Sequence, residues 1–517
     1  GTTLVTGAFD HEVGGDFENN GTFTATAGSV VHMNGAAAQT ILGTSSINFE
    51  GLTIENMLNV SLAEDINITN ELLLLGGNLV VGSEALGING TINNLSGAID
   101  VNSNSNLNFG GTATITLNDN LFTNSPVVNN LTINRSGGVT LGNQDLEVSG
   151  VFTATTGTLT LDGNTLTFSG SSPTRTSGTI DASNANSALK FTNTSAITLP
   201  DNLFTGTIAN FTVNSSGGVL SDGDLSITGI LNLESSNPSA TKGSLDMDTT
   251  KIIDMGVNAT TVGIGDVTGI VRRNHVFSNG IEYTFGNEFT SLNFLNVPSS
   301  TKPTWVQCKI TIGTAPTWRN EAINRTYSFA QSGGDDRMIV KLHYLDNELH
   351  GAETDESKLV FWDGYDPGLA ANNFVEKFPR NHNDNNTFNN WVQLTGPAID
   401  YIATSSTLDV KQWSLGYTNV TEHTWIGLGS PTYPGDWSLP GHWNGGVPDK
   451  EDDAVIPTTL PVGNSGYPTK NLLPIIAPSE VNTLEIETSA TLNASDYDIT
   501  IYGNVAAWVN NGTFIPG

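Results

Sequence analysis

The chain has 517 residues, with 51 Asp and Glu against 19 Lys and Arg, and a formal net charge of −32. This charge excludes phosphate-backbone binding as a main role and disfavours adsorption to anionic lipid, because both surfaces select basic proteins. Only 14% of residues are charged and 56 are Gly, as in secreted all-β proteins with many turns. We expect no nucleic acid partner, and no membrane insertion, since no run of 18 apolar residues exists.

From Gly1 to about Val267 the sequence alternates between apolar and polar residues in short segments broken by Gly, Asn and Asp. Residues 158–161 (Thr-Leu-Thr-Leu) and 165–168 (Thr-Leu-Thr-Phe) are typical. Apolar residues at every second position point one face of a strand inward. No segment here has helical periodicity, so this region is predicted to consist of short strands.

A long internal repeat runs through the same region. Leu52, Leu131 and Phe211 open equivalent stretches at intervals of 79 and 80 residues. Each stretch contains a second signature, an Asp followed by an alternating strand, at Asp65, Asp145 and Asp224. Short strands in so long a repeat predict several coils of a β-solenoid, in which each coil is covered by the next. We interpret the repeated Asp as a turn residue bonding its own backbone, not as a catalytic acid.

The composition changes near Ile270. Eight of the nine Trp lie between Trp305 and Trp443, and strand-like runs such as 338–344 and 358–362 are separated by longer loops. This pattern predicts an antiparallel, Ig-like β-sandwich over residues 268–420. Cys308, the only cysteine, lies in an alternating run and is expected to be packed and unreactive.

The solenoid pattern returns near the end of the chain. Residues 421–480 are rich in Trp and Pro and are predicted to form a linker and cap. Leu484 then opens a strand like Leu131, and Gly503 follows Leu484 by 19 residues, as Gly150 follows Leu131. The predicted fold is therefore all-β: a solenoid (1–267) with a super-repeat of about 80 residues, the inserted sandwich, and the start of a further solenoid segment (481–517).

Several motifs together resemble those of the giant repetitive β-solenoid surface proteins and adhesins of gliding, type-nine-secreting bacteria. One run reads Trp425, Asp436-Trp437, Trp443-Asn444-Gly445-Gly446-Val447-Pro448 and 452–457 (Asp-Asp-Ala-Val-Ile-Pro). The segment from Val271-Arg272-Arg273 through 283–286 (Tyr-Thr-Phe-Gly) to 412–416 (Gln-Trp-Ser-Leu-Gly) is similar to their sandwich modules. The resemblance implies an extracellular, cell-surface location. The carboxy-terminal sorting domain of such proteins is absent from this sequence, which implies an internal fragment or a processed subunit.

The sequence offers no anchor for catalysis. Its eight His are scattered, and it has neither a His-Glu-x-x-His run nor a Gly-x-Ser-x-Gly elbow. We expect no enzyme and no cofactor, with calcium left open at acidic turns: Asp335-Asp336, the loop Asn381–Asn386 containing Asp384, and Asp452-Asp453. The alternative for these acids is that they are solvated turn residues. Trp425, Trp437 and Trp443 are expected to plug the solenoid end rather than stack on sugar.

The two ends of the chain share the pentapeptide Asn-Asn-Gly-Thr-Phe, at Asn19–Phe23 and Asn510–Phe514. If a second copy followed, the interval from Leu484 to the next Leu52 would be 85 residues, close to the internal 79 and 80. We therefore predict a fibre or filament subunit that joins other copies of itself head to tail. Phe23, Trp508 and Phe514 are the candidate junction residues.

Two other functions remain as alternatives. One is a cell-surface adhesin that binds glycans through the sandwich or the Trp-rich linker. The other is a solenoid enzyme acting on polysaccharides, which would need two or three carboxylates on adjacent coils.

Overall fold

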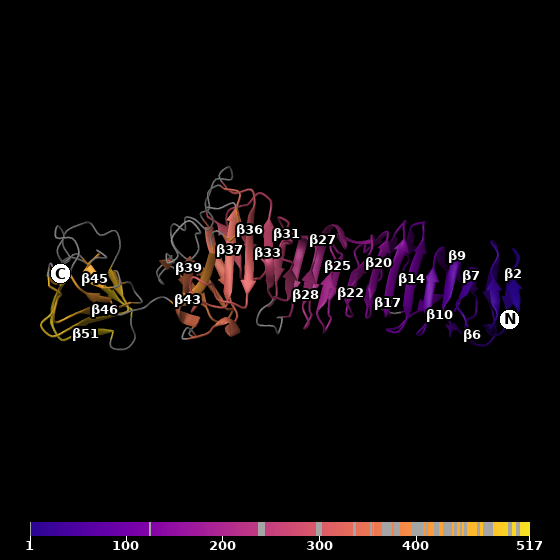
Figure 1. Ribbon diagram of the computed structural model, residues 1–517, viewed down its shortest axis with the longest axis horizontal. Coiled ribbons are helices and arrows are strands. Elements are labelled where there is room, and N and C mark those ends of the chain that lie inside the picture. Colours follow the sequence, from indigo (N-terminus) through magenta and orange to yellow (C-terminus); the bar gives the residue numbers. More distant parts are fainter. Residues whose placement is uncertain are drawn as a thin grey trace. The chain divides into compact units, whose positions relative to one another are not determined.

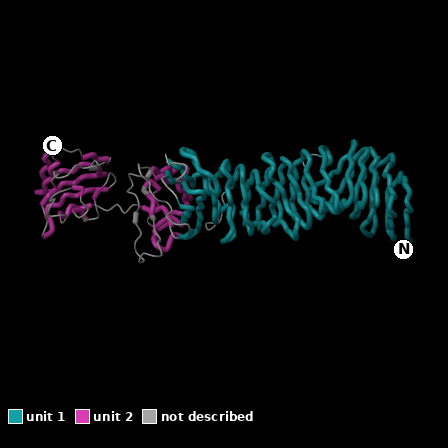
Figure 2. The backbone as a smooth tube through the Cα atoms, turned by 90° about the horizontal axis from the view of Figure 1, so that it is seen from above, with its two compact units in different colours: residues 1–314, 326–340, 400–411 teal, residues 315–325, 341–399, 412–517 magenta. Residues whose placement is uncertain are grey.

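The computed structural model is all-β; within the residues described, helix is limited to the 3₁₀ turns η2 (Asp346–Glu348) and η3 (Glu356–Lys358) and one 3₁₀ residue, His442. It describes residues 2–123, 126–235, 243–295, 302–333, 338–351, 354, 356–363, 375–376, 383–394, 407–409, 412–417, 423–427, 437–438, 442–444, 447–448, 452–462, 466–468, 479–494, 499–502 and 507–516. Two compact units divide the chain (Figure 2): residues 1–314, 326–340 and 400–411 form the first, and residues 315–325, 341–399 and 412–517 form the second.

The first unit is dominated by the predicted β-solenoid, whose strands stack in parallel from coil to coil (Figure 1). The first two coils contain three strands each: β1 (Thr3–Val5), β2 (Asp10–Val13) and β3 (Phe17–Asn19), then β4 (Thr22–Thr24), β5 (Val30–Met33) and β6 (Gln39–Gly43). β1 pairs with β4, β2 with β5 and β3 with β6. One circuit of the chain therefore returns each strand beside its predecessor.

Inward-pointing residues of successive coils form continuous apolar columns. Leu52 in β7 (Ile47–Ile54) lies opposite Val31 on one side and Leu72 in β9 (Ile66–Leu74) on the other. All three are buried. The residues that open the predicted repeats, Leu131 and Phe211, are likewise fully buried, so the repeat marks the core. Because no single coil encloses these side chains, their burial depends on stacking.

The repeated Asp residues connect neighbouring coils. Asp65 Oδ1 accepts the Ala85 backbone N–H at 2.7 Å, and Asp145 Oδ1 accepts that of Thr165 at 2.7 Å. Asp224 Oδ1 accepts the Ile252 N–H at 2.8 Å. The expectation that these side chains bond their own backbone is therefore wrong. Each carboxylate accepts a backbone N–H of the next coil, at the first residue of the strand that pairs with the strand following the Asp.

Residues 115–123 and 197–205, which are identical in all but one position, form the same turn in two copies of the repeat. Asn120 and Asn202 adopt left-handed backbone conformations, with φ of 62° and 57°. Asn tolerates this region better than most residues. The turn buries the following Leu121 and Leu203, whose carbonyls accept the N–H groups of Ile99 and Ile180 at 2.7 and 2.8 Å. The repeat thus preserves a turn that ties each loop to the preceding coil.

The parallel stack ends at β33 (Val267–Arg273), which pairs with β31 (Ile252–Met255) in parallel and with β36 (Val306–Ile312) in antiparallel. Arg273 is fully buried beside this change of direction and donates to the carbonyls of Gly256, Ala259 and Thr284 at 3.0, 2.7 and 3.0 Å. Burial lowers the Arg273 pKa to about 10, so the guanidinium stays charged at neutral pH. This contact joins the Val-Arg-Arg and Tyr-Thr-Phe-Gly motifs.

The prediction that Cys308 is a packed residue is confirmed. It is fully buried in β36, opposite Val271 of β33. A buried thiol between apolar strands lacks the exposure that a reactive cysteine needs.

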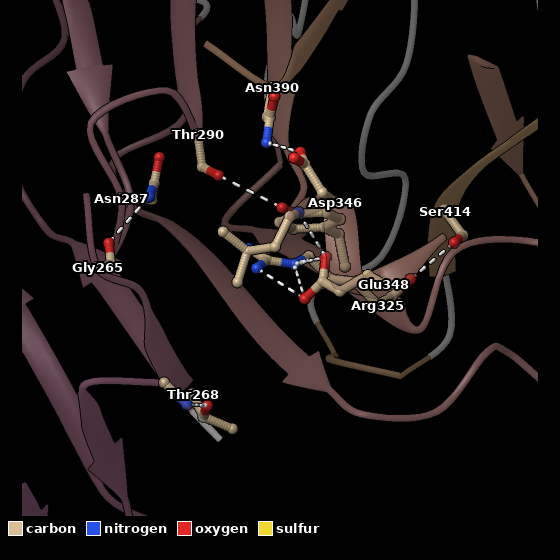
Figure 3. A network of polar contacts seen from close by, with 12 residues as sticks. Gly265, Thr268, Asn287, Thr290, Arg325, Asp346, Glu348, Asn390 and Ser414 are labelled. Carbon is tan, nitrogen blue, oxygen red and sulfur yellow. Dashed lines mark hydrogen bonds and ion pairs between the residues drawn. The ribbon is translucent and has the colours of Figure 1, made fainter. Parts of the chain in front are cut away.

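The second unit contains antiparallel strands of the predicted sandwich: β39 (Leu359–Asp363) pairs with β43 (Gln412–Tyr417), and β41 (Asn383–Asn386) with β42 (Trp391–Leu394). A buried ion pair lies in this part of the unit (Figure 3). Arg325 Nη2 donates to Glu348 Oε1 at 2.9 Å, and the two side chains are 0% and 2% exposed. The Arg325 carbonyl accepts from the Ser414 hydroxyl at 2.7 Å.

The carboxy-terminal solenoid segment also lies in the second unit. Its last two coils pair β47 (Ser479–Val481) with β50 (Ile499–Ile501), β48 (Thr483–Ile486) with β51 (Trp508–Asn510), and β49 (Thr491–Asn493) with β52 (Thr513–Ile515), all in parallel. The stack begins inside the segment expected to be linker and cap, because β44 (His423–Trp425) and β46 (Asp453–Ile456) pair in parallel and β46 pairs with β48. Of the motif residues named above, Asp436, Gly445, Gly446 and Gly503 lie outside the described residues.

The Asp contacts between coils give a direct test. Replacing Asp145 by Ala removes the acceptor for the Thr165 N–H, and a typical hydrogen bond contributes about 1 kcal/mol. We expect the peptide covering residues 165–168 to exchange its amide hydrogens about fivefold faster, measured by mass spectrometry. Asp145→Asn keeps an oxygen in place and should change exchange by much less. Equal exchange in Asp145→Ala and the parent protein would show that the contact does not hold the coils together.

Candidate assembly surfaces at the solenoid ends

The described residues do not assemble a metal site, since no three His, Cys, Asp or Glu side chains cluster as ligands. Of the acidic turns considered for calcium, Asp335-Asp336 lies outside the described part of the chain. Asp453 Oδ1 accepts from the Asn482 side chain at 3.0 Å and the Thr483 hydroxyl at 2.6 Å. Asp452 Oδ2 lies 3.4 Å from His423 Nε2. These two carboxylates therefore hold strands together, and Asp384 lies in β41 opposite Gln393.

The tryptophans expected to plug the second solenoid are packed in its core. Trp425, Trp437 and Trp443 are 0%, 2% and 3% exposed, in one cluster with Leu484 and Ile486. Trp425 and Trp443 meet edge to face, with ring centroids 5.1 Å apart. The three rings are therefore packed, and their role as a plug of the solenoid end stays a prediction. Buried rings do not offer a stacking platform for sugar.

The first coil presents the unpaired side of three parallel strands. Within the described residues β1, β2 and β3 are each hydrogen-bonded to a neighbour on one side only. We call this surface, made of the outer edges of β1, β2 and β3, the amino-terminal end face. Leu4 and Phe9 are 55% and 70% exposed there. Leu4 pairs with Phe23, and paired residues of neighbouring strands point to the same side of the sheet. Leu4 therefore points toward the solenoid core, and the end face exposes core side chains.

The last coil presents a similar surface. Within the part of the chain that the structure describes, β50, β51 and β52 also pair on one side only, and their outer edges form the carboxy-terminal end face. Trp508 is 40% exposed, whereas its partner one coil inward, Leu484, is 1% exposed. Phe514 is half-buried against the buried Leu492. Among the described residues, no further coil covers the apolar side chains at this face.

The two ends are built alike. At the amino-terminal end Thr3 pairs with Thr22 and Leu4 with Phe23; at the other end Thr491 pairs with Thr513 and Leu492 with Phe514. β49 therefore corresponds to β1 and β52 to β4, both in side chains and in register. β50 and β51, which precede β52, correspond to β2 and β3.

The shared pentapeptide forms the same turn at both ends. Asn19 Oδ1 accepts the Gly21 N–H at 3.3 Å, and Asn510 Oδ1 accepts the Gly512 N–H at 3.1 Å. A Cβ on Gly21 would lie 2.4 Å from the Thr2 carbonyl oxygen. On Gly512 it would lie 2.5 Å from that of Ala490, the equivalent residue. Glycine is thus required at this position because the backbone passes too close for a side chain.

Aromatic rings beside this turn also match. Phe17 and Phe23 meet at 5.3 Å and 86°, and Trp508 and Phe514 at 4.8 Å and 85°. At the amino-terminal end a third ring from the following coil, Phe49, packs 5.3 Å from Phe17 and 5.5 Å from Phe23. In the pair at the carboxy-terminal end, Trp508 is 40% exposed and Phe514 is half-buried.

Both end faces are acidic. No Lys or Arg occurs before Arg135 or after Lys470. The amino-terminal coil carries Asp10, Glu12, Asp16 and Glu18, and the last two coils carry Glu480, Glu485 and Glu487. Two such faces brought together repel each other at low ionic strength.

Two of the three predicted junction residues lie at an end face, and the third lies one strand behind the other. Trp508 and Phe514 form one ring pair on the carboxy-terminal end face, and Phe23 is one strand behind the amino-terminal end face, against Leu4. Sequence reasoning missed Leu4, Phe17 and Ile501. The shared Thr-Leu at residues 3–4 and 491–492 was an available signal.

Comparisons of the chain with models of protein families, with curated proteins and with solved structures return no match. The described residues contain no helix with the length and hydropathy needed to span a bilayer.

The glycine of the turn provides a test of the end structure. We expect Gly21→Ala to loosen the first coil, because its Cβ meets the Thr2 carbonyl, and overpacking costs about 1–3 kcal/mol. Cleavage within residues 2–13 by a dilute protease should then be several-fold faster. Gly15→Ala is the matched control, since a Cβ there meets nothing within 4 Å. If both variants are cleaved at the parent rate, the turn does not constrain the first coil.

Proposed function

We propose that this protein is a structural, extracellular component of a fibre or filament at the cell surface, whose copies join head to tail through their solenoid ends. The observation that carries the proposal is the match between the two end coils. They share strand register, the Asn-Gly turn and an edge-to-face ring pair. The fold supports a structural role, because a β-solenoid is a stack of repeats that extends by adding coils.

Exposed strand edges supply a reason for association. Within the described residues, the three parallel strands of each end face pair on one side only, and such edges template pairing with another chain. A contact between unlike ends repeats along one direction and does not close on itself. Burying a large apolar side chain contributes about 1.5–3 kcal/mol, and Leu4 and Trp508 are 55% and 40% exposed. Both backbone pairing and apolar burial therefore favour the same end-to-end contact.

The location is supported by composition and by the sequence resemblance. A single cysteine, few charged residues and many Thr, Asn and Gly suit secreted all-β repeat proteins. The resemblance to surface proteins of gliding bacteria points to the same compartment.

Substitution of Trp508 tests the proposal. Trp508→Glu replaces an apolar ring by a carboxylate on an acidic surface, so we expect self-association to weaken at least about a hundredfold. Sedimentation velocity over a concentration series measures the effect. Val462→Glu is the matched control, because Val462 is 102% exposed and is not part of β50, β51 or β52. A parent protein that stays monomeric at all concentrations would refute the proposal.

Salt should strengthen the association. Raising NaCl from about 0.1 M to about 1 M shortens the Debye length from about 10 Å to about 3 Å, which screens the repulsion between two faces that carry only acidic charges. We expect larger sedimenting species at the higher salt. Dissociation on adding salt would instead mean that ion pairs hold the copies together, which contradicts the arrangement described.

A further inference from the structure

A groove of about 770 Å³ lies on the side of the first solenoid, between loops of two successive coils. Residues 94–98 line it from one coil, and residues 119, 120, 122 and 123 line it from the next. We propose that this groove binds a neutral oligosaccharide, with Asp119, Asn94 and Asn120 as hydrogen-bonding groups and Leu95 as the apolar contact. The site is separate from both end faces and does not depend on head-to-tail assembly.

Backbone contacts hold both walls of the groove in place. The Ile99 N–H donates to the Leu121 carbonyl at 2.7 Å, and the Thr123 N–H donates to the Ile99 carbonyl at 3.1 Å. On the opposite wall the Leu95 N–H donates to the Leu74 carbonyl of the preceding coil at 2.9 Å. The groove is therefore formed before any ligand arrives, which lowers the entropic cost of binding. Its volume lies in the range of about 300–1,000 Å³ that is usual for ligand sites.

The polar side chains of the groove have hydrogen-bonding capacity to spare. Among the described residues, the side chains of Asn94 and Asn120 have no hydrogen-bond partner. Asp119 accepts from the Asn143 side-chain amide at 2.9 Å and from its backbone N–H at 3.1 Å. These two hydrogen bonds lower the pKa of Asp119, so its carboxylate is ionised at neutral pH. A carboxylate offers about four acceptor positions, so Asp119 can also accept from ligand hydroxyls.

The surroundings of the groove select the class of ligand. Within residues 60–174 the only Lys or Arg is Arg135, and its side chain is fully buried. An acidic sugar or a phosphate would therefore meet the Asp119 carboxylate with no exposed cation to pair with. Leu95 is 75% exposed and adds an apolar surface. A neutral sugar ring matches this combination, because it carries hydroxyls around its edge and C–H groups on its faces.

The second copy of the repeat keeps the turn beside the groove but changes the lining. In the alignment of the two copies, Thr176 stands in the position of Leu95, and Asp201 in that of Asp119. The Asp201 carboxylate lies 3.3 Å from the Lys251 ammonium, whereas the partners of Asp119 are neutral amides. The solenoid therefore forms without the apolar side chain and the cation-free carboxylate, and the second copy supplies matched control positions in the same chain.

Titration of the full-length chain with soluble oligosaccharides tests the site. The probes are neutral oligosaccharides of glucose, mannose, galactose and xylose, with oligogalacturonate as the acidic probe and chitosan oligosaccharide as the cationic one. We expect a neutral probe to bind, measured by calorimetry, and to slow amide hydrogen exchange in residues 94–98 and 119–123. Leu95→Ala and Asp119→Asn should each weaken binding by about tenfold, since one removes apolar contact and the other a charge-assisted acceptor.

The control variants Thr176→Ala and Asp201→Asn change the equivalent positions of the second copy and should leave binding at the parent level. Parent-level binding by both Leu95→Ala and Asp119→Asn, or equal weakening by the controls, would place the ligand elsewhere and overturn the site. Binding of no neutral probe, or preference for the acidic or the cationic probe, would overturn the proposed ligand class. Neither result would bear on assembly through the solenoid ends.

Discussion

Every coil of the two solenoids depends on the coil that covers it. A parallel strand satisfies only one side of its backbone with each neighbour, and the inward side chains of one coil are enclosed only when the next is in place. Trp508 shows the consequence: it is 40% exposed in the last coil, whereas Leu484, its partner one coil inward, is 1% exposed. The same constraint explains why the Asp side chains at 65, 145 and 224 bond the following coil.

The fold was largely predictable from the sequence, because the alternation within strands and the long repeat between groups of coils can both be read from the order of residues. Alternation of apolar residues identifies strands, and the intervals between Leu52, Leu131 and Phe211 identify stacked coils. The partner of each Asp was not predictable in this way. A turn motif shows that an acceptor is present, but the fold decides which N–H group lies next to it. Here the donor lies 20 or 28 residues further along the chain.

The candidate site was predicted in part. The shared pentapeptide led to Phe23, Trp508 and Phe514, and the structure places all three in or beside the terminal coils. The equivalence of strands β49–β52 with β1–β4 was not evident from the sequence, because their connecting loops differ in length. Thr491 aligns with Thr3 at a separation of 488 residues, but Trp508 aligns with Phe17 at 491, because the loop before β51 is longer. Pairing registers are insensitive to such loop changes and therefore revealed the correspondence.

The most direct test is cryo-electron microscopy of the protein assembled at high salt. The account predicts filaments in which the last coil of one copy meets the first coil of the next, with Trp508 enclosed at the contact. Filaments built from side-by-side contacts, or from two like ends meeting, would contradict it.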